Sequence, residues 1–152
     1  MAKDWYVVWC SSGRERETVS KLKRLDGIHR VLFLTSAILE RRGGKWGVRD
    51  RALFPGYIFV WCEMSVTLYY QVRGIPHVHR WLGNSNGTPE AVPADEMDNI
   101  LKAWSYLQAG GDPQEFLQDV HISGRQRRGY GVLRIHGKAY RISFSLAQAA
   151  KQ

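Results

Sequence analysis

The stretch that decides the fold is Leu53-Phe54-Pro55-Gly56-Tyr57-Ile58-Phe59-Val60-Trp61-Cys62. A Pro-Gly pair is typical of a turn, because proline presets φ and glycine accepts a positive φ without strain. The six residues that follow are apolar without alternation, which is typical of a strand buried on both faces. We therefore expect Tyr57–Cys62 to form an inner strand of a sheet, entered through a turn at Pro55 and Gly56.

The segment nearest the N-terminus predicts a second buried strand, followed by a helix. Trp5–Cys10 is a continuous apolar and aromatic run. Ser12 and Glu15 have the spacing of a capping box, in which Ser12 is the N-cap of the helix and Glu15 follows three residues later. Gly27 is a typical residue to end that helix. The apolar side chains that this helix would bury are Val19, Leu22 and Leu25.

Turn signals and apolar periodicity predict the remaining elements. Gly43-Gly44 lies between basic residues and indicates the tip of a hairpin. The segment 94–107 has apolar residues at helical spacing and acids in its first turn, which the helix dipole favours. Beyond residue 119 the pattern is that of strands, at 120–122, 132–135 and 140–144. We also expect strands at 28–34 and 77–82, and a helix at 65–73.

The charge of this 152-residue chain is unevenly distributed. Its formal net charge is +8, yet residues 81–119 carry seven acids and one lysine. Residues 120–152 carry seven Lys or Arg and no acid. Segregated basic segments favour a nucleic-acid partner. A basic composition that serves only solubility remains the alternative at this stage.

The sequence offers no motif for catalysis or for a cofactor. Two histidines, His77 and His79, would share one face of a strand, but no carboxylate or thiolate accompanies them at metal-ligand spacing. The two cysteines, Cys10 and Cys62, lie in apolar runs and predict buried thiols in a cytoplasmic protein. The apolar runs are far shorter than the ~20 residues of a membrane span. We expect a monomeric, non-enzymatic protein without cofactor, metal or membrane partner.

A partial RNA-binding signature occurs near the C-terminus. Arg128–Ile135 matches the first four positions of the RNA-recognition-motif strand, but Val132 and Ile135 stand where that motif has stacking aromatics. In that fold, another helix and strand would have to follow. A basic hairpin turn is the better interpretation of this stretch.

Several segments in order resemble the N-terminal domain of the NusG family of transcription elongation factors. The resemblance covers roughly residues 4–107. No single segment is specific for this family. A Trp-Tyr start followed at this spacing by a Phe-Pro-Gly-Tyr strand is a specific combination. The matching residues are Trp5-Tyr6-Val7-Val8, Gly13, Glu15, Arg42-Gly43-Gly44, Leu53–Val60, Val72–Val78, Leu82-Gly83, Pro89, Val92-Pro93 and Glu96-Met97.

The resemblance implies a fold and a function. The fold would be α+β, an antiparallel sheet flanked by helices. Family members bind the clamp helices of bacterial RNA polymerase, bridge the main cleft and reduce pausing. The polymerase-contacting aromatics would be Phe54 and Tyr57, with Trp5 and Tyr6 nearby. The residues that would face DNA in the elongation complex are Arg41, Arg42 and Lys45 of the basic hairpin, and Arg73.

The C-terminal part departs from the family pattern. NusG proteins normally end in a KOW domain, a small β-barrel, and Val132–Phe144 resembles its last hairpin, whereas the Gly-rich first hairpin is shortened or lost. We therefore expect residues 1–108 to be the polymerase-binding domain, 109–118 a linker and 119–152 a short all-β, KOW-like tail that is an incomplete barrel. Such a tail argues against contacts with Rho or a ribosomal protein.

The shortened tail favours a specialised paralogue of the RfaH type that suppresses pausing or termination. Its basic residues, among them Arg125, Arg127 and Arg128, would contact RNA or DNA. The alternative is a stand-alone RNA- or DNA-binding module that acts through this tail alone.

Overall fold

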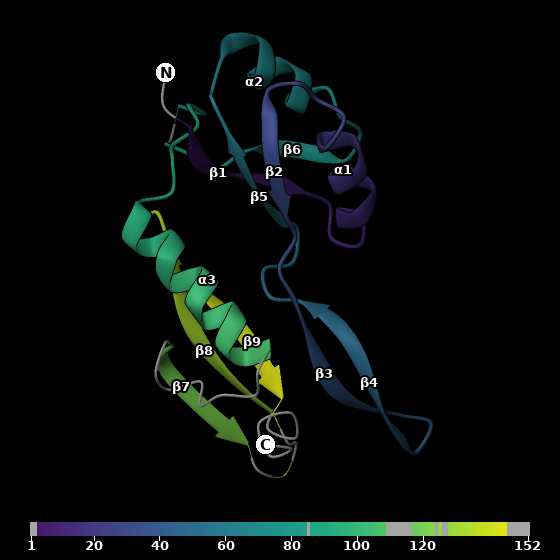
Figure 1. Cartoon of the computed structure of the whole chain (residues 1–152). Coiled ribbons are helices and arrows are strands. Elements are labelled where there is room, and N and C mark those ends of the chain that lie inside the picture. Colours follow the sequence, from purple (N-terminus) through teal and green to yellow (C-terminus); the bar gives the residue numbers. More distant parts are fainter. Residues whose placement is uncertain (1–2, 85, 109–116, 124, 126–127, 146–152) are drawn as a thin grey trace. The chain divides into compact units, whose positions relative to one another are not determined.

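The structure is a computed structural model that describes residues 3–84, 86–108, 117–123, 125 and 128–145. The chain divides into two compact units. The first unit comprises Met1–Phe33 and Pro55–Pro93, and the second comprises Leu34–Phe54 and Ala94–Gln152. Figure 1 labels the helices and strands of both. The antiparallel sheets and three described helices confirm the predicted α+β class.

The first unit is built on a four-stranded antiparallel sheet. Its strand order is β2 (Ile28–Leu32), β5 (Tyr57–Cys62), β1 (Asp4–Cys10) and β6 (Val78–Trp81). Strand β5 pairs with β1 on one side and with β2 on the other, so it is an inner strand as predicted. Its consecutive residues Ile58, Phe59 and Val60 are all fully buried. The absence of alternation along β5 therefore reflects burial on both faces of the sheet.

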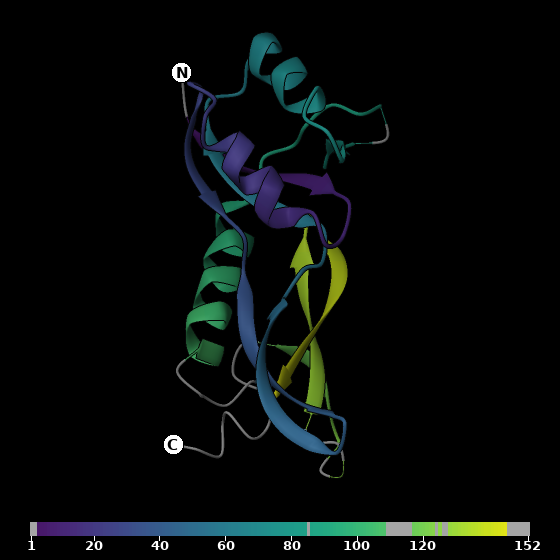
Figure 2. The ribbon, with the colours of Figure 1, turned by 90° about the vertical axis from the view of Figure 1, so that its right-hand side faces the viewer.

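Helices α1 (Glu15–Leu22) and α2 (Val66–Arg73) cover one face of this sheet. Leu22 from α1 and Leu68 and Val72 from α2 form a common core with Val8 and Val60 of the inner strands. The Ser65 hydroxyl accepts a hydrogen bond from the Leu68 amide and so caps the start of α2. Figure 2 shows both helices beside the strands that they cover.

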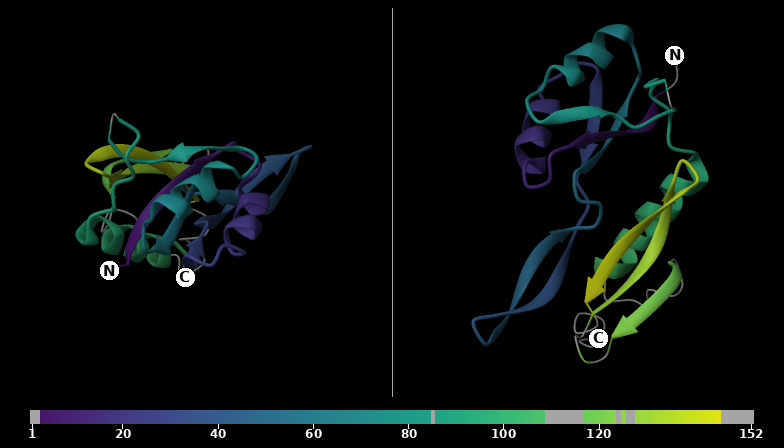
Figure 3. Two further views of the ribbon diagram at one scale, coloured as in Figure 1. Left: turned by 90° about the horizontal axis from the view of Figure 1, so that it is seen from above. Right: turned by 180° about the vertical axis from the view of Figure 1, so that it is seen from behind.

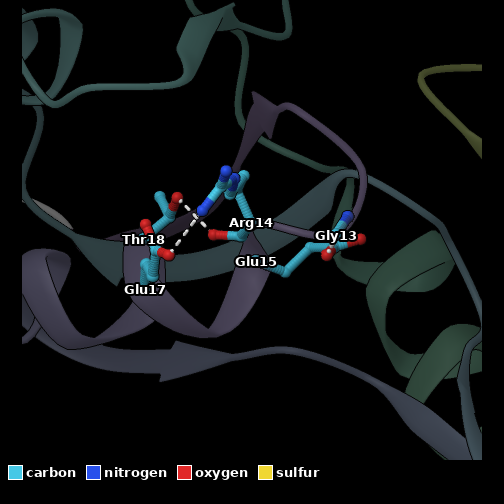
Figure 4. Close-up of polar contacts among 5 residues, drawn as sticks. All are labelled: Gly13, Arg14, Glu15, Glu17 and Thr18. Carbon is cyan, nitrogen blue, oxygen red and sulfur yellow. Dashed lines mark hydrogen bonds and ion pairs between the residues drawn. The ribbon is translucent and has the colours of Figure 1, made fainter.

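The start and the end of α1 differ from the sequence prediction. Arg14 rather than Ser12 is the N-cap, and no side chain caps the helix. Arg14 instead bonds the Glu17 carboxylate at 2.9 Å, while Glu15 accepts a hydrogen bond from the Gly13 amide (Figure 4). The helix ends at Leu22, well before Gly27, whose Cα hydrogens lie against the Leu68 side chain. Close packing, and not helix termination, therefore accounts for Gly27.

The second unit contains the predicted basic hairpin and the longest described helix. Strands β3 (Thr35–Arg42) and β4 (Lys45–Ala52) are joined by Gly43 and Gly44, both at positive φ, as the Gly-Gly signal predicts. Helix α3 (Ala94–Gln108) is fixed to the base of this hairpin. The Trp104 indole and the Gln108 amide both donate to the Thr35 carbonyl, at 2.8 and 2.6 Å.

A three-stranded antiparallel sheet completes the second unit. It consists of β7 (Gln118–Ser123), β8 (Arg128–Ile135) and β9 (Lys138–Ser145), with β8 in the middle (Figure 3). The Glu96 carboxylate of α3 accepts hydrogen bonds from the amides of His136 and Gly137, in the turn between β8 and β9. This all-β element confirms the predicted β character of the tail. The predicted division at residues 108 and 118 remains a prediction, and most of that linker lies outside the described residues.

Candidate functional site

An aromatic row lies on the face of the first sheet opposite α1 and α2. Side chains alternate along a strand, and Val8, Ile58 and their neighbours of the same parity face the helices. Trp5 and Trp9 of β1 therefore face the other way, as do their register partners Trp61 and Tyr57 on β5. The rings of Trp5 and Trp61 lie 5.4 Å apart. Two cross-strand aromatic pairs thus lie on this face, one on each side of the buried pair Val7 and Phe59.

Cationic and imidazole groups border these aromatic rings. The Arg30 guanidinium lies 5.3 Å from the ring centroid of Trp5, and that of Arg80 lies 5.7 Å from the ring of Trp9. The His79 ring is 4.7 Å from that of Trp9 and bonds the Ser11 hydroxyl through Nε2. Arg30, His79 and Arg80 are exposed, and Trp9 has 36% of its surface exposed. This pattern combines apolar rings with positive charge at the surface.

The four predicted polymerase-contacting residues differ in their surroundings. Trp5 and Tyr57 are half-buried and lie on the aromatic row. Tyr6 points to the helical face, where its ring meets that of Trp81 edge-on at 6.0 Å, and burial raises the pKa of its hydroxyl. Phe54 is buried in the second unit, with its ring 6.2 Å from that of Tyr140. The aromatic row therefore contains two of the four.

Trp9 is an aromatic residue of the row that the sequence pattern does not single out. The run Trp5–Cys10 predicts burial throughout, because it contains no polar residue that would reveal an exposed position. Strand alternation supplies the missing signal, since residues four apart on a strand share a face. Trp9 shares a face with Trp5, and its register partner is Tyr57.

The loop before Tyr57 is fixed by backbone hydrogen bonds. The Cys10 amide donates to the Gly56 carbonyl at 2.7 Å, and the Gly56 amide donates to the buried Glu15 carboxylate at 2.9 Å. Gly56 has a φ of +85°, and a Cβ there would lie 2.7 Å from the Cys10 carbonyl oxygen. The turn predicted at Pro55-Gly56 therefore requires glycine, and it sets the start of β5.

The basic hairpin exposes its predicted residues. Arg41, Arg42 and Lys45 adjoin its tip, and every residue from 41 to 51 is exposed. Trp46 pairs with Arg41 across the hairpin and has 45% of its surface exposed. The hairpin thus presents several cations and an aromatic ring to solvent.

The other predicted basic residues lie elsewhere. Arg73 is in the first unit, at the end of α2, and its guanidinium donates to the Tyr69 hydroxyl at 3.0 Å. Arg125 is exposed in the connection between β7 and β8, and Arg128 is half-buried at the start of β8. Arg127 lies outside the described residues. The described basic residues therefore come from the hairpin, from α2 and from the C-terminal sheet with its β7–β8 connection.

The described part of the chain contains no cluster of three or more His, Cys, Asp or Glu residues that could hold a metal ion. The expectation that His77 and His79 share a strand face is wrong, because β6 begins at Val78 and His77 has a φ of 72°. Cys10 and Cys62 are buried free thiols, as predicted. Burial raises the pKa of the Cys62 thiol to about 12. Among the described helices, none is both long and apolar enough to cross a membrane.

Comparison with known proteins identifies the family. Residues 3–101 match the family described as "Transcription termination factor nusG". The chain belongs to the NusG family. The matched range includes the aromatic row, the basic hairpin and the first two turns of α3. The resemblance seen in the sequence is thereby confirmed.

Individual relatives give the same result. The chain is 31% identical over 117 residues to the transcription termination/antitermination protein NusG of Escherichia coli K12, a match that covers 72% of this chain. It is 32% identical over 109 residues, or 67% of this chain, to the protein of the same name from Pseudomonas aeruginosa. These matches span 63% and 62% of the relatives' own length.

A solved structure supports the fold. The chain is similar to the structure titled "Domain interaction in Thermotoga maritima NusG", with a TM-score of 0.65 and 20% identity. That similarity covers 97% of this chain and 96% of the other. It therefore extends through both units to the C-terminal strands, beyond the part of the sequence that the family match covers.

Proposed function

We propose that this protein is a transcription elongation or antitermination factor that binds the clamp helices of RNA polymerase, bridges the cleft and suppresses pausing or termination. The family match over residues 3–101 carries the proposal. In this proposal the protein is a specialised paralogue without enzymatic activity. Binding to the polymerase supplies its effect, because a bridge across the cleft favours the closed clamp.

The aromatic row is the surface that we assign to the polymerase. Trp9 and Tyr57 form a cross-strand pair, and Trp9 is partly exposed. Aromatic rings on a rigid sheet supply a large contact area with little loss of side-chain entropy, and apolar surfaces of this kind accommodate helices. Arg80 and His79 beside Trp9 would add polar contacts at the rim.

The basic hairpin is the element that we assign to DNA in the elongation complex. Its exposed Arg41, Arg42 and Lys45 suit phosphates, which they would bind without reading the sequence. Arg73, Arg125 and Arg128 are further cations for nucleic-acid contact. In this proposal the hairpin adds affinity for the complex rather than affinity for the polymerase alone.

A retention experiment tests polymerase binding. Core RNA polymerase is incubated with the immobilised 152-residue chain, and retention is compared among wild type, Tyr57→Ala and Tyr70→Ala. Tyr70 is the matched control, because it is an exposed tyrosine on α2, on the opposite side of the sheet. Retention that Tyr57→Ala reduces and Tyr70→Ala preserves is the expected result. Wild-type protein that retains no core polymerase would instead favour a stand-alone nucleic-acid-binding module.

A further inference from the structure

Three side chains form a continuous stack across the C-terminal sheet. His121 of β7 lies over Tyr130 of β8, with ring centroids 4.8 Å apart and an interplanar angle of 24°. The guanidinium carbon of Arg141 on β9 lies 4.2 Å from the centroid of the same Tyr130 ring. We call these three residues the stacked triad. The three strands are neighbours in one sheet (Figure 3). An imidazole, a phenol and a guanidinium thus lie together across them.

The stacked triad lies on the outer face of the sheet. Leu133 and Ile135 of β8 and Ile142 and Phe144 of β9 are buried on the inner face. Tyr130 on β8 alternates with the buried Leu133, and Arg141 on β9 alternates with the buried Ile142, so both lie on the outer face. His121 is the register partner of Tyr130 and shares that face. His121 and Arg141 are exposed, and Tyr130 is half-buried. Because β7 and β9 flank β8 on opposite sides, the stack ends in an exposed imidazole and an exposed guanidinium.

The segment that carries the triad is strongly basic. Residues 118–145 contain six Lys or Arg and a single acid, Asp119. Arg128 and Arg134 have the same parity as Tyr130 on β8, so they share its face. Arg134 is exposed and bonds the Gln118 side chain at 3.2 Å and the Gly137 carbonyl at 2.9 Å. Asp95 and Glu96 of α3 line a pocket with Gln118, Val132 and Arg134, so acids offset the charge at that end. Around the triad itself, the outer face combines planar groups with the cations Arg128 and Arg141.

This combination suits single-stranded nucleic acid. Unpaired bases stack on aromatic rings and on guanidinium planes, while cations along the path bind the phosphates. A purely structural cross-strand pair has no need of the basic surroundings. Duplex nucleic acid keeps its bases in its own stack and could use only the charges. We propose that the outer face of the C-terminal sheet binds single-stranded RNA by stacking bases on the ends of the stacked triad.

A hydroxyl beside the triad favours RNA over DNA. Ser143 of β9 is exposed and is the register partner of Tyr130, opposite His121. Directly opposed residues of an antiparallel pair lie on the same face, within reach of one ligand. A serine hydroxyl both donates and accepts hydrogen bonds, so it can pair with the ribose 2′-hydroxyl, which DNA lacks. The proposal extends the nucleic-acid contacts described above, and it does not require that the protein bind polymerase.

Fluorescence anisotropy of a labelled oligouridine of about ten nucleotides tests the proposal with the 152-residue chain. Arg141→Lys is the decisive variant, because it retains the positive charge and removes the planar guanidinium group on which a base would stack. We expect Arg141→Lys and Tyr130→Val each to weaken binding at least about fivefold. Lys138→Ala removes an exposed charge of the same strand at the opposite parity, and we expect it to change affinity less than Arg141→Lys does. A circular-dichroism spectrum unchanged from wild type checks that each variant is folded.

Two results would overturn the proposal. The first is that folded Arg141→Lys and Tyr130→Val bind the oligouridine with wild-type affinity. Unspecific attraction between charges would then account for the binding. The second is equal or tighter binding of the matching oligodeoxyuridine, which would contradict the assignment to RNA. We expect the protein to bind the DNA oligonucleotide more weakly than the RNA. In Ser143→Ala the difference between the two affinities should be smaller. No polymerase is present in the anisotropy experiment. A negative result for RNA binding therefore says nothing about polymerase retention, and a negative retention result says nothing about RNA binding.

Discussion

The buried carboxylate of Glu15 accepts a hydrogen bond from the backbone amide of Gly56 at 2.9 Å, across 41 positions of the chain. Its other oxygen accepts a hydrogen bond from the Gly13 amide at 2.7 Å. One side chain therefore joins the beginning of α1 to the loop that leads into Tyr57. A buried carboxylate is costly unless it is hydrogen-bonded, and both of its oxygens are satisfied here. Glu15 thus positions the start of β5, where the aromatic row begins.

Glu15→Ala should destabilise the first unit. The substitution leaves the buried Gly56 amide without its acceptor, which costs about 1–3 kcal/mol in the free energy of unfolding. Glu17→Ala is the matched control on the same helix, because Glu17 is exposed and makes an ion pair with Arg14. Exposed pairs of this kind contribute at most about 1 kcal/mol. Urea denaturation followed by tryptophan fluorescence measures both, and equal losses would contradict the role given to Glu15.

Gly56→Ala should destabilise the first unit more than Gly87→Ala. Both glycines have a similar positive φ, +85° and +81°, so both substitutions incur the same kind of backbone strain. At Gly56 the new Cβ would also lie 2.7 Å from the Cys10 carbonyl oxygen, whereas at Gly87 it meets open space. The difference between the two losses, measured by thermal denaturation, isolates the cost of that close approach. Similar melting temperatures for the two variants would argue against a tightly fixed turn.

Stability should decrease at alkaline pH because of Cys62. Burial raises the pKa of its thiol from 9.0 to about 12. The unfolded state therefore releases the proton at a lower pH than the folded state does. The contribution of the Cys62 thiol to the free energy of unfolding is complete below pH 9 and is lost progressively between pH 9 and about 12. Over that range Cys62→Ala should show a shallower decrease in the free energy of unfolding, by up to about 1.4 kcal/mol per pH unit. Parallel pH profiles would contradict this account.

Removal of charge from the basic hairpin should weaken binding to elongation complexes more than binding to isolated clamp helices. The variant carries alanine at Arg41, Arg42 and Lys45, because these exposed cations are the ones that we assign to DNA phosphates. Its binding to the complex should also depend less on salt, with a slope lowered by about one per lost phosphate contact. The control carries alanine at Lys21, in α1, and at Lys23 and Arg24, just after it. It loses the same number of positive charges. Equal losses toward the complex and the isolated helices would contradict the assignment to DNA.

Much of the fold follows from local sequence signals. The unbroken apolar run of Tyr57–Cys62 predicts an inner strand, and Gly43-Gly44 predicts the hairpin tip; the structure has both. These signals are reliable because burial on two faces and positive φ each restrict the choice of residue strongly. The capping box at Ser12 failed for a non-local reason. Glu15 has the right spacing for a cap, but its second partner, Gly56, is brought to it only by the tertiary fold.

The candidate site was less predictable than the fold. Neighbouring residues such as Trp5 and Tyr6 look alike in the sequence, yet the sheet directs them to opposite faces. The stacked triad is distributed over three strands, so its members have no recognisable spacing along the chain. The partial RNA-recognition signature at Arg128–Ile135 includes Tyr130. Its neighbours His121 and Arg141 become apparent only from the register of the sheet.

In-vitro transcription through a pause site tests the central claim most directly. Wild-type protein at saturating concentration should shorten the pause of bacterial RNA polymerase. Tyr57→Ala should lose most of that effect, and Tyr70→Ala should retain it, because only Tyr57 lies on the aromatic row. A pause duration that wild-type protein leaves unchanged would contradict the assignment of this protein as an elongation or antitermination factor.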